Sequence, residues 1–499
     1  MTARPIVVVG DTLLDRDIDG AVTRVCPDAA APVLDERHVT DRPGGAGLAA
    51  VLAADQGHPV ALVTALAADP AGLRLAALLT AAGVDLHPLS LGGATAEKIR
   101  LRTRGQVLVR LDRGGTGSVG DGLPTSTRDL LAAAAAVVVS DYGRGVARVC
   151  ALRAALAAAR VPVVWDPHPR GPAAIAGVRL VTPNEAEVRQ LTGHPAGDSR
   201  VASAARSADE LRRRWRAGAV AVTMGGDGAL LCHAGATPLV VPAPASTEGD
   251  TCGAGDRFAT AAAIALAGGA VVSEAVQSAV AQASRYVADG GAAAVRLSSG
   301  GAPGRIGADV PGRIRADAPG RIGADAPERI GAQAVAALVA RVRGVGGTVV
   351  ASGGCFDLLH AGHVSALQAA RQMGDCLIVC LNSDRGVARL KGPDRPVVPE
   401  PDRARLLAAL GCVDAVIVFD EDTPHAVLSW LRPDIWVKGG DYAGGGTGQP
   451  DLPEAELVGR WGGQTAIVPY LDGRSTTSMI AAARAGRPRP TGPLLEGAR

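Results

Sequence analysis

The chain has 499 residues, of which 47% are hydrophobic, so it is long enough for two or three domains with buried cores. Its 51 lysine and arginine residues nearly balance 49 aspartate and glutamate residues, which leaves a net charge of +2. This balance gives the chain no overall basic footprint and argues against a nucleic-acid-binding protein.

The sequence shows no feature of export or membrane insertion. An apolar run at residues 6–9 follows the first five residues directly, so we expect no signal peptide. The longest apolar stretch, residues 258–272, is too short and too rich in glycine to span a bilayer, so we expect no membrane partner. The eight cysteines form no CxxC pair and no cysteine–histidine zinc pattern, which is typical of a reduced, cytoplasmic protein.

Residues 1–299 alternate short apolar runs with alanine-rich stretches, and we assign them to one domain. Such alternation of strands and helices predicts a parallel α/β sheet that is covered on both faces. The expected strands lie at 6–9, 60–63, 137–140, 161–165, 180–181 and 220–224, and helices are expected at 130–136 and 151–159.

An eight-residue motif repeats between residues 302 and 333 as APGRIGAD, VPGRIRAD, APGRIGAD and APERIGAQ. The unit is too short for a solenoid repeat and is rich in proline, glycine and charge, so we expect a flexible linker over 300–333. Its arginines are balanced by acidic residues, which disfavours a nucleic-acid-binding arm. The last domain, 334–499, is expected to begin with a helix at 334–343 and to continue as a second α/β pattern, with strands at 348–351, 377–381 and 415–419 and a helix from about Gly362.

A short glycine-rich sequence, Gly253-Ala254-Gly255-Asp256, precedes the helical run 257–267. Backbone N–H groups at a helix N-terminus can bind phosphate without a lysine, and Asp256 can there accept a proton from an attacking hydroxyl. Positioning and charge stabilisation carry most of phosphoryl transfer, so little else is required of the protein. By itself, this sequence fits a helix start without a ligand better than a kinase site. The chain has no Walker A motif, which excludes a P-loop kinase.

Four further motifs accompany this sequence: GDTLLDR (10–16), RPGGAG (42–47, expected in a loop), SDYGRG (140–145) and TPNEAE (182–187). With them, residues 1 to about 298 resemble a ribokinase-family sugar kinase. The closer resemblance is to the kinase half of the bifunctional heptose 7-phosphate kinase/heptose 1-phosphate adenylyltransferase.

The resemblance implies a role for each matching residue. Asp256 is then the catalytic base, and Gly253, Ala254 and Gly255 form an anion hole. Asn184 and Glu187 lie near the nucleotide and organise Mg²⁺ indirectly, through its waters. The residues implied to hold the sugar are Asp11, Asp15, Gly44, Gly45, Lys98 and Asp141, and those implied to lie near the nucleotide are Thr223, Gly225 and Gly228.

Two residues depart from the family pattern and leave the sugar open. Leu48 stands where the family has an asparagine that contacts the sugar, and Arg144 stands where lysine is common. Lys98 and Arg100 match a Lys-x-Arg segment that can meet the terminal phosphate of the sugar. A solvated charge on a strand explains these two residues nearly as well.

A second motif, His360-Ala361-Gly362-His363, follows an expected strand and a glycine pair. Two histidines three residues apart at a helix start point to the same side, where they can stabilise charge on a triphosphate as pyrophosphate leaves. Two histidines without a nearby third ligand make a poor zinc site. The surrounding FDLLHAGH (356–363) resembles the nucleotidyltransferase superfamily that carries an HxGH motif.

Several segments between and after these histidines resemble the adenylyltransferase half of the same bifunctional protein: NSD (382–384), RLKG (389–392), VKGGDY (437–442) and GRSTT (473–477). Two of the three lysines in the chain fall inside these matches, which weakly supports a need for an ammonium group. The residues implied to bind the nucleotide are Phe356, Asp357, Lys391, Lys438, Asp441, Ser475, Thr476 and Thr477.

The sequence therefore predicts an α/β protein with a ribokinase-like domain and a smaller Rossmann-like nucleotidyltransferase domain. The resemblance implies an ATP- and Mg²⁺-dependent kinase that phosphorylates the anomeric hydroxyl of D-glycero-D-manno-heptose 7-phosphate. It further implies adenylyl transfer from ATP to heptose 1-phosphate, which gives ADP-heptose and pyrophosphate. The alternative is a fused enzyme for another sugar phosphate or for CTP. A regulatory pseudoenzyme is disfavoured because Asp256 and both histidines are present. The expected partners are sugar phosphates and ATP, and a homodimer is expected only by analogy with ribokinase-like enzymes that dimerise through a lid.

Overall fold

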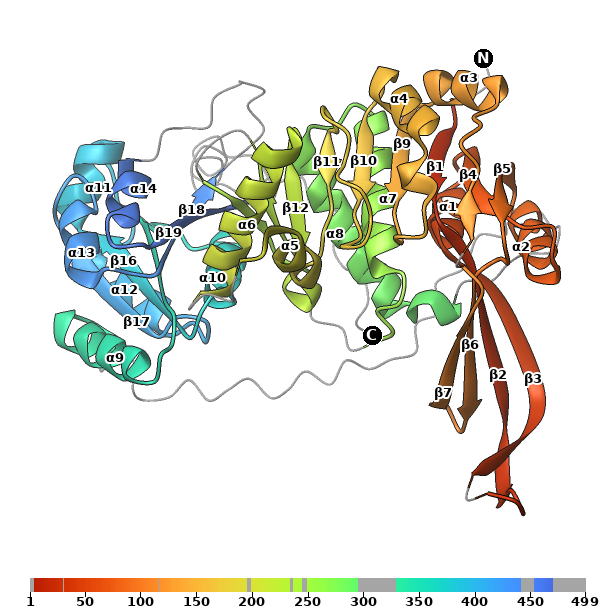
Figure 1. The fold of residues 1–499 in the computed structure, drawn as a ribbon. Coiled ribbons are helices and arrows are strands. Elements are labelled where there is room, and N and C mark those ends of the chain that lie inside the picture. The colour runs from red at the N-terminus through yellow and green to blue at the C-terminus, as the bar shows by residue number, and fades with distance from the viewer. Residues whose placement is uncertain are drawn as a thin grey trace, which may run out of the picture. The chain divides into compact units, whose positions relative to one another are not determined.

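The structure is a computed structural model and describes residues 4–29, 31–115, 117–194, 199–233, 237–244, 249–294, 329–440 and 453–469. The chain divides into two compact units, the first mainly within residues 1–310 and the second mainly within residues 311–499 (Figure 1). Most of the predicted linker, residues 300–328, lies outside the described residues. Within the described residues, no helix is both long and apolar enough to cross a bilayer.

The first unit contains a mostly parallel sheet, as the alternating pattern predicted. In the order in which they neighbour one another, its strands are β14 (Leu239–Val241), β13 (Ala229–Cys232), β12 (Val220–Thr223), β11 (Leu180–Val181), β10 (Val163–Asp166), β9 (Ala136–Ser140), β1 (Ile6–Gly10), β4 (Val60–Leu66), β5 (Val84–Gly92) and β8 (Ser118–Val119). Every residue of β1 and β9 is buried, which fits a central position and cover on both faces.

Helices pack on both sides of this sheet, and two of them position the functional residues. α1 and α7 pack against each other and against the central strands, and α8 packs on α7. α7 begins after Gly253, whose φ of 80° is a conformation that favours glycine. The helices are α1 (Ala46–Ala54), α2 (Pro70–Ala81), α3 (Thr125–Ala133), η1 (Val146–Arg148), α4 (Cys150–Ala158), α5 (Glu185–Thr192), α6 (Arg200–Trp215), η2 (Gly225–Asp227), α7 (Ala254–Ala267), α8 (Val272–Ala288) and η3 (Gly291–Ala294).

A second, four-stranded sheet extends away from the first one and was not predicted (Figure 1). Its neighbouring strands are β3 (Pro32–Gly45), β2 (Thr12–Val25), β6 (Glu97–Thr103) and β7 (Gln106–Arg113), and we call it the lid sheet. The expectation of a loop at Gly44 and Gly45 was wrong, because both residues end β3 and pair with β2. Charged residues are frequent in these strands, so the sequence lacks the apolar runs that predict a buried strand.

The second unit contains a five-stranded parallel sheet with the order β17 (Ala415–Phe419), β16 (Cys376–Asn382), β15 (Val349–Gly354), β18 (Ile435–Gly440) and β19 (Gln464–Pro469). The strand order reverses between β15 and β18, and open α/β sheets bind ligands beyond the carboxyl ends of such strands. The predicted fold class is confirmed for both domains. The helices are α9 (Ala332–Gly344), α10 (Ala361–Arg371), α11 (Asp384–Lys391), α12 (Glu400–Ala408), α13 (His425–Leu431) and α14 (Pro453–Gly459).

Two candidate active sites

The predicted catalytic base of the first unit lies in the first turn of α7, directly after the glycine-rich turn. Asp256 is buried, with 4% of its surface exposed. Its carboxylate accepts hydrogen bonds from the Ser140 hydroxyl at 3.1 Å and from the Tyr142 hydroxyl at 2.9 Å. Both donors come from the carboxyl end of β9, so the site lies where Gly10 and Ser140 end neighbouring strands.

The electrostatic environment of Asp256 suits proton transfer near neutral pH. Burial raises the pKa of this carboxyl to about 7. The hydrogen bonds from Tyr142 and Ser140 act in the opposite direction and lower the pKa, but burial outweighs them. Asp15 raises the same pKa and Lys98 lowers it, so both charges act on the Asp256 carboxylate. A general base is most effective when its pKa lies near the working pH, and Asp256 meets that condition.

Asp11 and Asp141, two of the predicted sugar-binding residues, hold the loop that follows β9. The Asp11 carboxylate accepts backbone N–H bonds from Tyr142 at 3.1 Å, Arg144 at 2.8 Å and Val146 at 2.9 Å. Asp141 accepts one from Gly143 at 2.8 Å, and burial raises its pKa to about 6. The geometry therefore gives both carboxylates a part in ordering the loop that carries Tyr142, and direct contact with a sugar stays a prediction.

Other predicted sugar residues meet at the base of the lid sheet. Lys98 on β6 is the register partner of Asp15 on β2, and Gly44 on β3 pairs with Leu13. A Cβ on Gly44 would lie only 2.4 Å from the Asp15 carboxylate, so the backbone of β3 approaches this side chain closely. Arg100, expected beside Lys98 at a terminal phosphate, donates to Asp15 at 2.9 Å.

Gly45 stands beside this group, where β3 passes into α1. Its φ is 62°, and a Cβ there would lie 2.4 Å from the carbonyl oxygen of Asp11. Only glycine satisfies both conditions, so we assign Gly45 to chain geometry at the site. Its contact with a sugar is untested.

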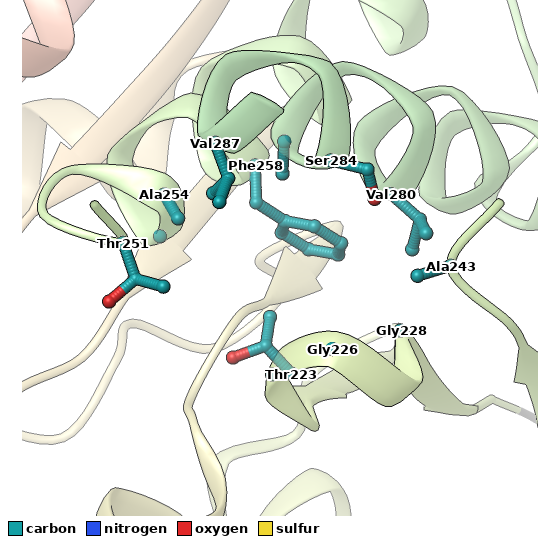
Figure 2. A pocket seen from close by; sticks show the side chains of 13 residues that line it. Thr223, Gly226, Gly228, Ala243, Thr251, Ala254, Phe258, Val280, Ser284 and Val287 are labelled. Atoms are coloured by element: carbon teal, nitrogen blue, oxygen red, sulfur yellow. The ribbon is translucent and has the colours of Figure 1, made fainter. Parts of the chain in front are cut away.

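A pocket runs between α7 and α8 on one side and the η2 turn on the other (Figure 2). Ala254 and Gly255 of the predicted anion hole line it, and the Phe258 ring points into it. The predicted nucleotide residues Thr223, Gly225 and Gly228 line the opposite side. The structure therefore places the predicted nucleotide residues and two residues of the predicted anion hole around one cavity. Asp256 follows the second of these two residues in the chain. Its other lining residues are Gly226, Ala243, Thr251, Val280, Ala283, Ser284 and Val287.

Asn184 and Glu187, the predicted Mg²⁺ organisers, form a reciprocal cap at the start of α5. Each side chain accepts the backbone N–H of the other residue at 2.9 Å. Burial raises the pKa of Glu187. Among the described residues, no group of three or more histidine, cysteine, aspartate or glutamate side chains has the geometry of a metal site. The part of Asn184 and Glu187 in organising Mg²⁺ stays a prediction.

Sequence reasoning gave no role to Ser140, Tyr142 or Asp166, although the SDYGRG motif contains the first two. Asp166 ends β10, is half-buried and accepts a hydrogen bond from the Thr182 hydroxyl at 2.9 Å. Desolvation, Glu187 and Asp256 all raise its pKa. The three residues share one available signal, since each is polar and stands at the end of an apolar run. Their proximity to Asp256 depends on strand order, which the sequence pattern does not give.

In the second unit, the two histidines of the HxGH motif lie at the start of α10. Their rings stack with centroids 4.0 Å apart and planes inclined by 25°. The Phe356 ring lies 5.3 Å from the His363 ring. Burial, and secondly His360, lower the pKa of His363 to about 4. His363 is therefore neutral near pH 7 and can donate a hydrogen bond without carrying a charge.

Asp357, predicted to bind the nucleotide, accepts hydrogen bonds from three protein groups. Its carboxylate accepts from Arg395 Nε at 2.5 Å and from the backbone N–H groups of Val397 at 2.7 Å and Val398 at 2.9 Å. These bonds fix the segment after α11 against the HxGH loop. Contact of Asp357 with a nucleotide remains an untested prediction.

Arg403 on α12 braces the same region from inside and was missed by sequence reasoning. Its side chain has no exposed surface. The guanidinium donates to the Cys355 carbonyl at 2.6 Å, the Asn382 carbonyl at 2.9 Å, the Val398 carbonyl at 2.9 Å and the Asp384 carboxylate at 2.6 Å. One buried cation thus connects the ends of β15 and β16, where the histidine loop starts.

The predicted lysines lie at the carboxyl side of this sheet. Lys391 ends α11 and is exposed. Burial raises the pKa of Cys355, and the charge of Lys391 acts against this rise. Lys438 lies near the end of β18 and pairs with Glu454 at 2.9 Å. The remaining predicted residues, Asp441, Ser475, Thr476 and Thr477, lie outside the described residues.

Comparison with known families agrees with both halves of this picture. The pfkB family carbohydrate kinase matches residues 3–298, and the cytidylyltransferase-like family matches residues 351–446. The fold and the sites therefore define a carbohydrate kinase joined to a nucleotidyltransferase. A solved ribokinase from Arabidopsis thaliana, complexed with ribose and ATP, is 22% identical with a TM-score of 0.47 and covers 57% of this chain and 93% of that chain.

Two curated relatives span nearly the whole chain. The bifunctional protein HldE of Streptomyces coelicolor is 53% identical over 485 residues, 97% of each protein. That of Azorhizobium caulinodans is 38% identical over 493 residues, 96% of this chain and 98% of the relative. The chain belongs to the family of bifunctional HldE proteins. The resemblance to a bifunctional heptose kinase and adenylyltransferase is confirmed, and both activities use ATP.

Proposed function

We propose that the first domain transfers the γ-phosphate of ATP to the anomeric hydroxyl of D-glycero-D-manno-heptose 7-phosphate. The observation that carries this proposal is the placement of Asp256. It lies buried, with its pKa raised to about 7, directly after Gly255, which lines the pocket. The charges of Asp15 and Lys98 both act on its carboxylate. A proton acceptor between a nucleotide pocket and a polar sugar side is what phosphoryl transfer to a hydroxyl requires.

In this mechanism, the anomeric hydroxyl attacks the γ-phosphorus while Asp256 accepts its proton. The bond from the γ-phosphorus to the β,γ-bridging oxygen breaks, and ADP leaves. The hydroxyls of Ser140 and Tyr142 hold the carboxylate in one orientation. The backbone N–H groups of Gly253, Ala254 and Gly255 stabilise the charge that develops on the transferred phosphoryl group.

The oxygen-rich surroundings of Asn184 and Glu187 suit Mg²⁺, a hard cation that prefers oxygen ligands and retains several waters. Asn184 and Glu187 would hold those waters. When bound, Mg²⁺ neutralises part of the phosphate charge of ATP.

The second domain then catalyses adenylyl transfer from ATP to heptose 1-phosphate. The sugar phosphate attacks the α-phosphorus of ATP, and pyrophosphate leaves without a covalent enzyme intermediate. His360 and the neutral His363 donate hydrogen bonds to the triphosphate, and Lys391 and Lys438 supply positive charge. Phe356, Asp441 and residues 475–477 complete the predicted nucleotide site. A separate phosphatase has to remove the 7-phosphate between the two steps.

The proposal also covers the cellular environment, the oligomeric state and the domain bounds. All eight cysteines are unpaired, which supports a reducing, cytoplasmic environment. β7 of the lid sheet exposes Val107, Leu108, Val109 and Leu111, which supports a homodimer that covers this strand. We propose domains at 1–299 and 334–499. In the structure, ordered contacts begin a few residues before the second bound, since Ile330 forms a β-bridge with Val416 and α9 begins at Ala332.

Product analysis by mass spectrometry tests the function. Purified protein is incubated with ATP, Mg²⁺ and heptose 7-phosphate, with and without an added 7-phosphatase. We expect a heptose bisphosphate alone, and ADP-heptose when the phosphatase is present. If ATP binds but the heptose is not phosphorylated, the sugar is a different one. If CTP replaces ATP with higher efficiency in the second step, the nucleotide assignment is wrong.

A further inference from the structure

The turn that carries the predicted anion hole, residues 250–253, is held by contacts from three directions. The Tyr286 hydroxyl on α8 donates a hydrogen bond to the Cys252 carbonyl at 2.9 Å. From α1, Leu48 approaches so closely that a Cβ on Gly253 would lie 2.6 Å from its Cδ2. A Cβ on Gly291 in η3 would lie 2.2 Å from the Asp250 carbonyl oxygen. The turn therefore has little freedom to move toward α1 or α8.

Leu48 and Tyr286 belong to one small apolar cluster beneath this turn. Its buried members are Leu48, Leu52, Tyr286 and Ala292, with Ala254 and Val287 packed against them. Figure 2 shows Ala254 and Val287 beside each other at the end of the nucleotide pocket where Thr251 lies. The cluster thus connects α1 and α8 directly to the first residue of α7.

A small movement of this turn would displace two chemical groups together. The N–H groups of Ala254 and Gly255 follow Gly253 directly, and Asp256 lies within the same helical turn. The Arg257 N–H bonds to the Gly253 carbonyl at 2.9 Å, so the turn and the helix start move as one unit. A displacement of about 1 Å at reacting groups is enough to lower a rate strongly.

We propose that Tyr286 and Leu48 are positioning residues for phosphoryl transfer, which hold the Cys252–Gly253 peptide so that the anion-hole N–H groups and Asp256 keep their alignment. Neither side chain is a catalytic residue, since both act through the turn. The Tyr286 hydroxyl fixes the carbonyl side of the peptide, and the Leu48 side chain limits movement of Gly253. The inference rests on the proposed kinase function of this site.

Tyr286→Phe is the sharpest variant, because it keeps the ring in the cluster and removes one hydrogen-bond donor. We expect the kinase kcat to fall about five- to tenfold, the range that the loss of one hydrogen bond allows, with the KM for the sugar phosphate within about twofold. Adenylyl transfer by the same purified chain should be unchanged and serves as an internal control. Unchanged kinase kcat would overturn the proposal.

Leu48 is tested by two variants of different volume. Leu48→Ala leaves a cavity under Gly253 and should lower the kinase kcat, whereas Leu48→Met conserves volume and should largely restore it. Leu156→Ala on α4 is the matched control, since it truncates another buried leucine elsewhere in the same domain. If Leu156→Ala lowers kcat as much as Leu48→Ala at a temperature where both are folded, the effect is general destabilisation and the proposal fails.

Hydrogen exchange provides a readout that needs no substrate. In the ligand-free full chain, Tyr286→Phe should raise exchange by about five- to tenfold in peptides covering 250–256 and leave β1 peptides unchanged. Faster exchange throughout the domain would indicate a merely structural role and contradict the proposal. If the wild-type chain phosphorylates no heptose, the proposed substrate has failed, and exchange still decides whether Tyr286 holds the turn.

Discussion

Replacement of Asp256 by asparagine should remove kinase activity and stabilise the kinase domain above neutral pH. The pKa of the buried carboxyl is raised from 3.8 to about 7, so the folded state binds this proton more tightly than the unfolded state does. The unfolded chain releases this proton above about pH 4, whereas the folded domain releases it only near pH 7. The free energy of unfolding of the kinase domain therefore falls as pH rises from about 4 to about 7. At about 1.4 kcal/mol per pH unit, the full cost of the charged form is about 4 kcal/mol.

Measuring the free energy of unfolding at two pH values separates the effect of the Asp256 charge from the effect of the altered side-chain shape. Between pH 5 and pH 8, the wild-type domain should lose about 3 kcal/mol relative to Asp256→Asn, because part of the titration is complete below pH 5. Urea unfolding, followed by hydrogen exchange of peptides from β1 and β9, measures the kinase domain apart from the rest of the chain. The same variant should lose at least about 100-fold in kcat, the usual contribution of a general base.

Asp17→Asn on β2 is a control, because the pKa of Asp17 is shifted in the opposite direction from that of Asp256. Burial acts to raise the pKa of Asp17, but its hydrogen bond from Arg42 and the nearby arginines outweigh burial and lower it. Its stabilising contribution is therefore present throughout pH 5–8, and its loss should destabilise the domain equally at both values. A pH-independent stability difference for Asp256→Asn, or retained kinase activity, would refute the reasoning about the buried base.

Four further outcomes are expected. The wild-type kinase kcat should rise about tenfold from pH 6 to pH 8, because Asp256 must be deprotonated, and a flat profile would contradict its role. The adenylyltransferase kcat/KM should show no titration of His363 from about pH 5.5 to 8, since its pKa is about 4; a step near pH 6.5 would contradict this. His363→Ala should lower pyrophosphate release at least about 100-fold and leave heptose phosphorylation unchanged; equal loss in both assays would argue against separate sites. Arg403→Met should destabilise the second domain by about 3–5 kcal/mol in urea, since it leaves Asp384 and the Cys355 carbonyl without their buried partner, and an effect below about 1 kcal/mol would contradict that account.

Local sequence was sufficient to predict most strands of both main sheets, because continuous apolar runs have few alternatives to a buried strand. The strand expected at 415–419 agrees with β17 (Ala415–Phe419) at both ends. The helix starts beside the two phosphate-handling motifs were also predictable, since Gly253 and the HxGH sequence mark them. These local signals and the motif resemblance determined the family and the two activities.

The lid sheet could not be read in the same way. Its strands carry frequent charges, and β7 is exposed along its whole length, so burial leaves no apolar pattern in the sequence. β2 pairs with the next strand, β3, and also with β6, which lies about 70 residues further along the chain. Lys98 therefore reaches the neighbourhood of Asp256 through pairing that no local pattern encodes.

The sequence by itself determined which chemistry this protein carries, because phosphate-binding turns and the HxGH histidines need particular residue types at short spacings. Only the tertiary structure decided the surroundings of each carboxylate. Asp11 and Asp357 have the same side chain as Asp256, yet backbone N–H groups occupy the first and a guanidinium with two N–H groups occupies the second. Burial raises the pKa of Asp256 to about 7, although hydrogen bonds from two hydroxyls lower it, and that environment is assembled from segments far apart in the chain.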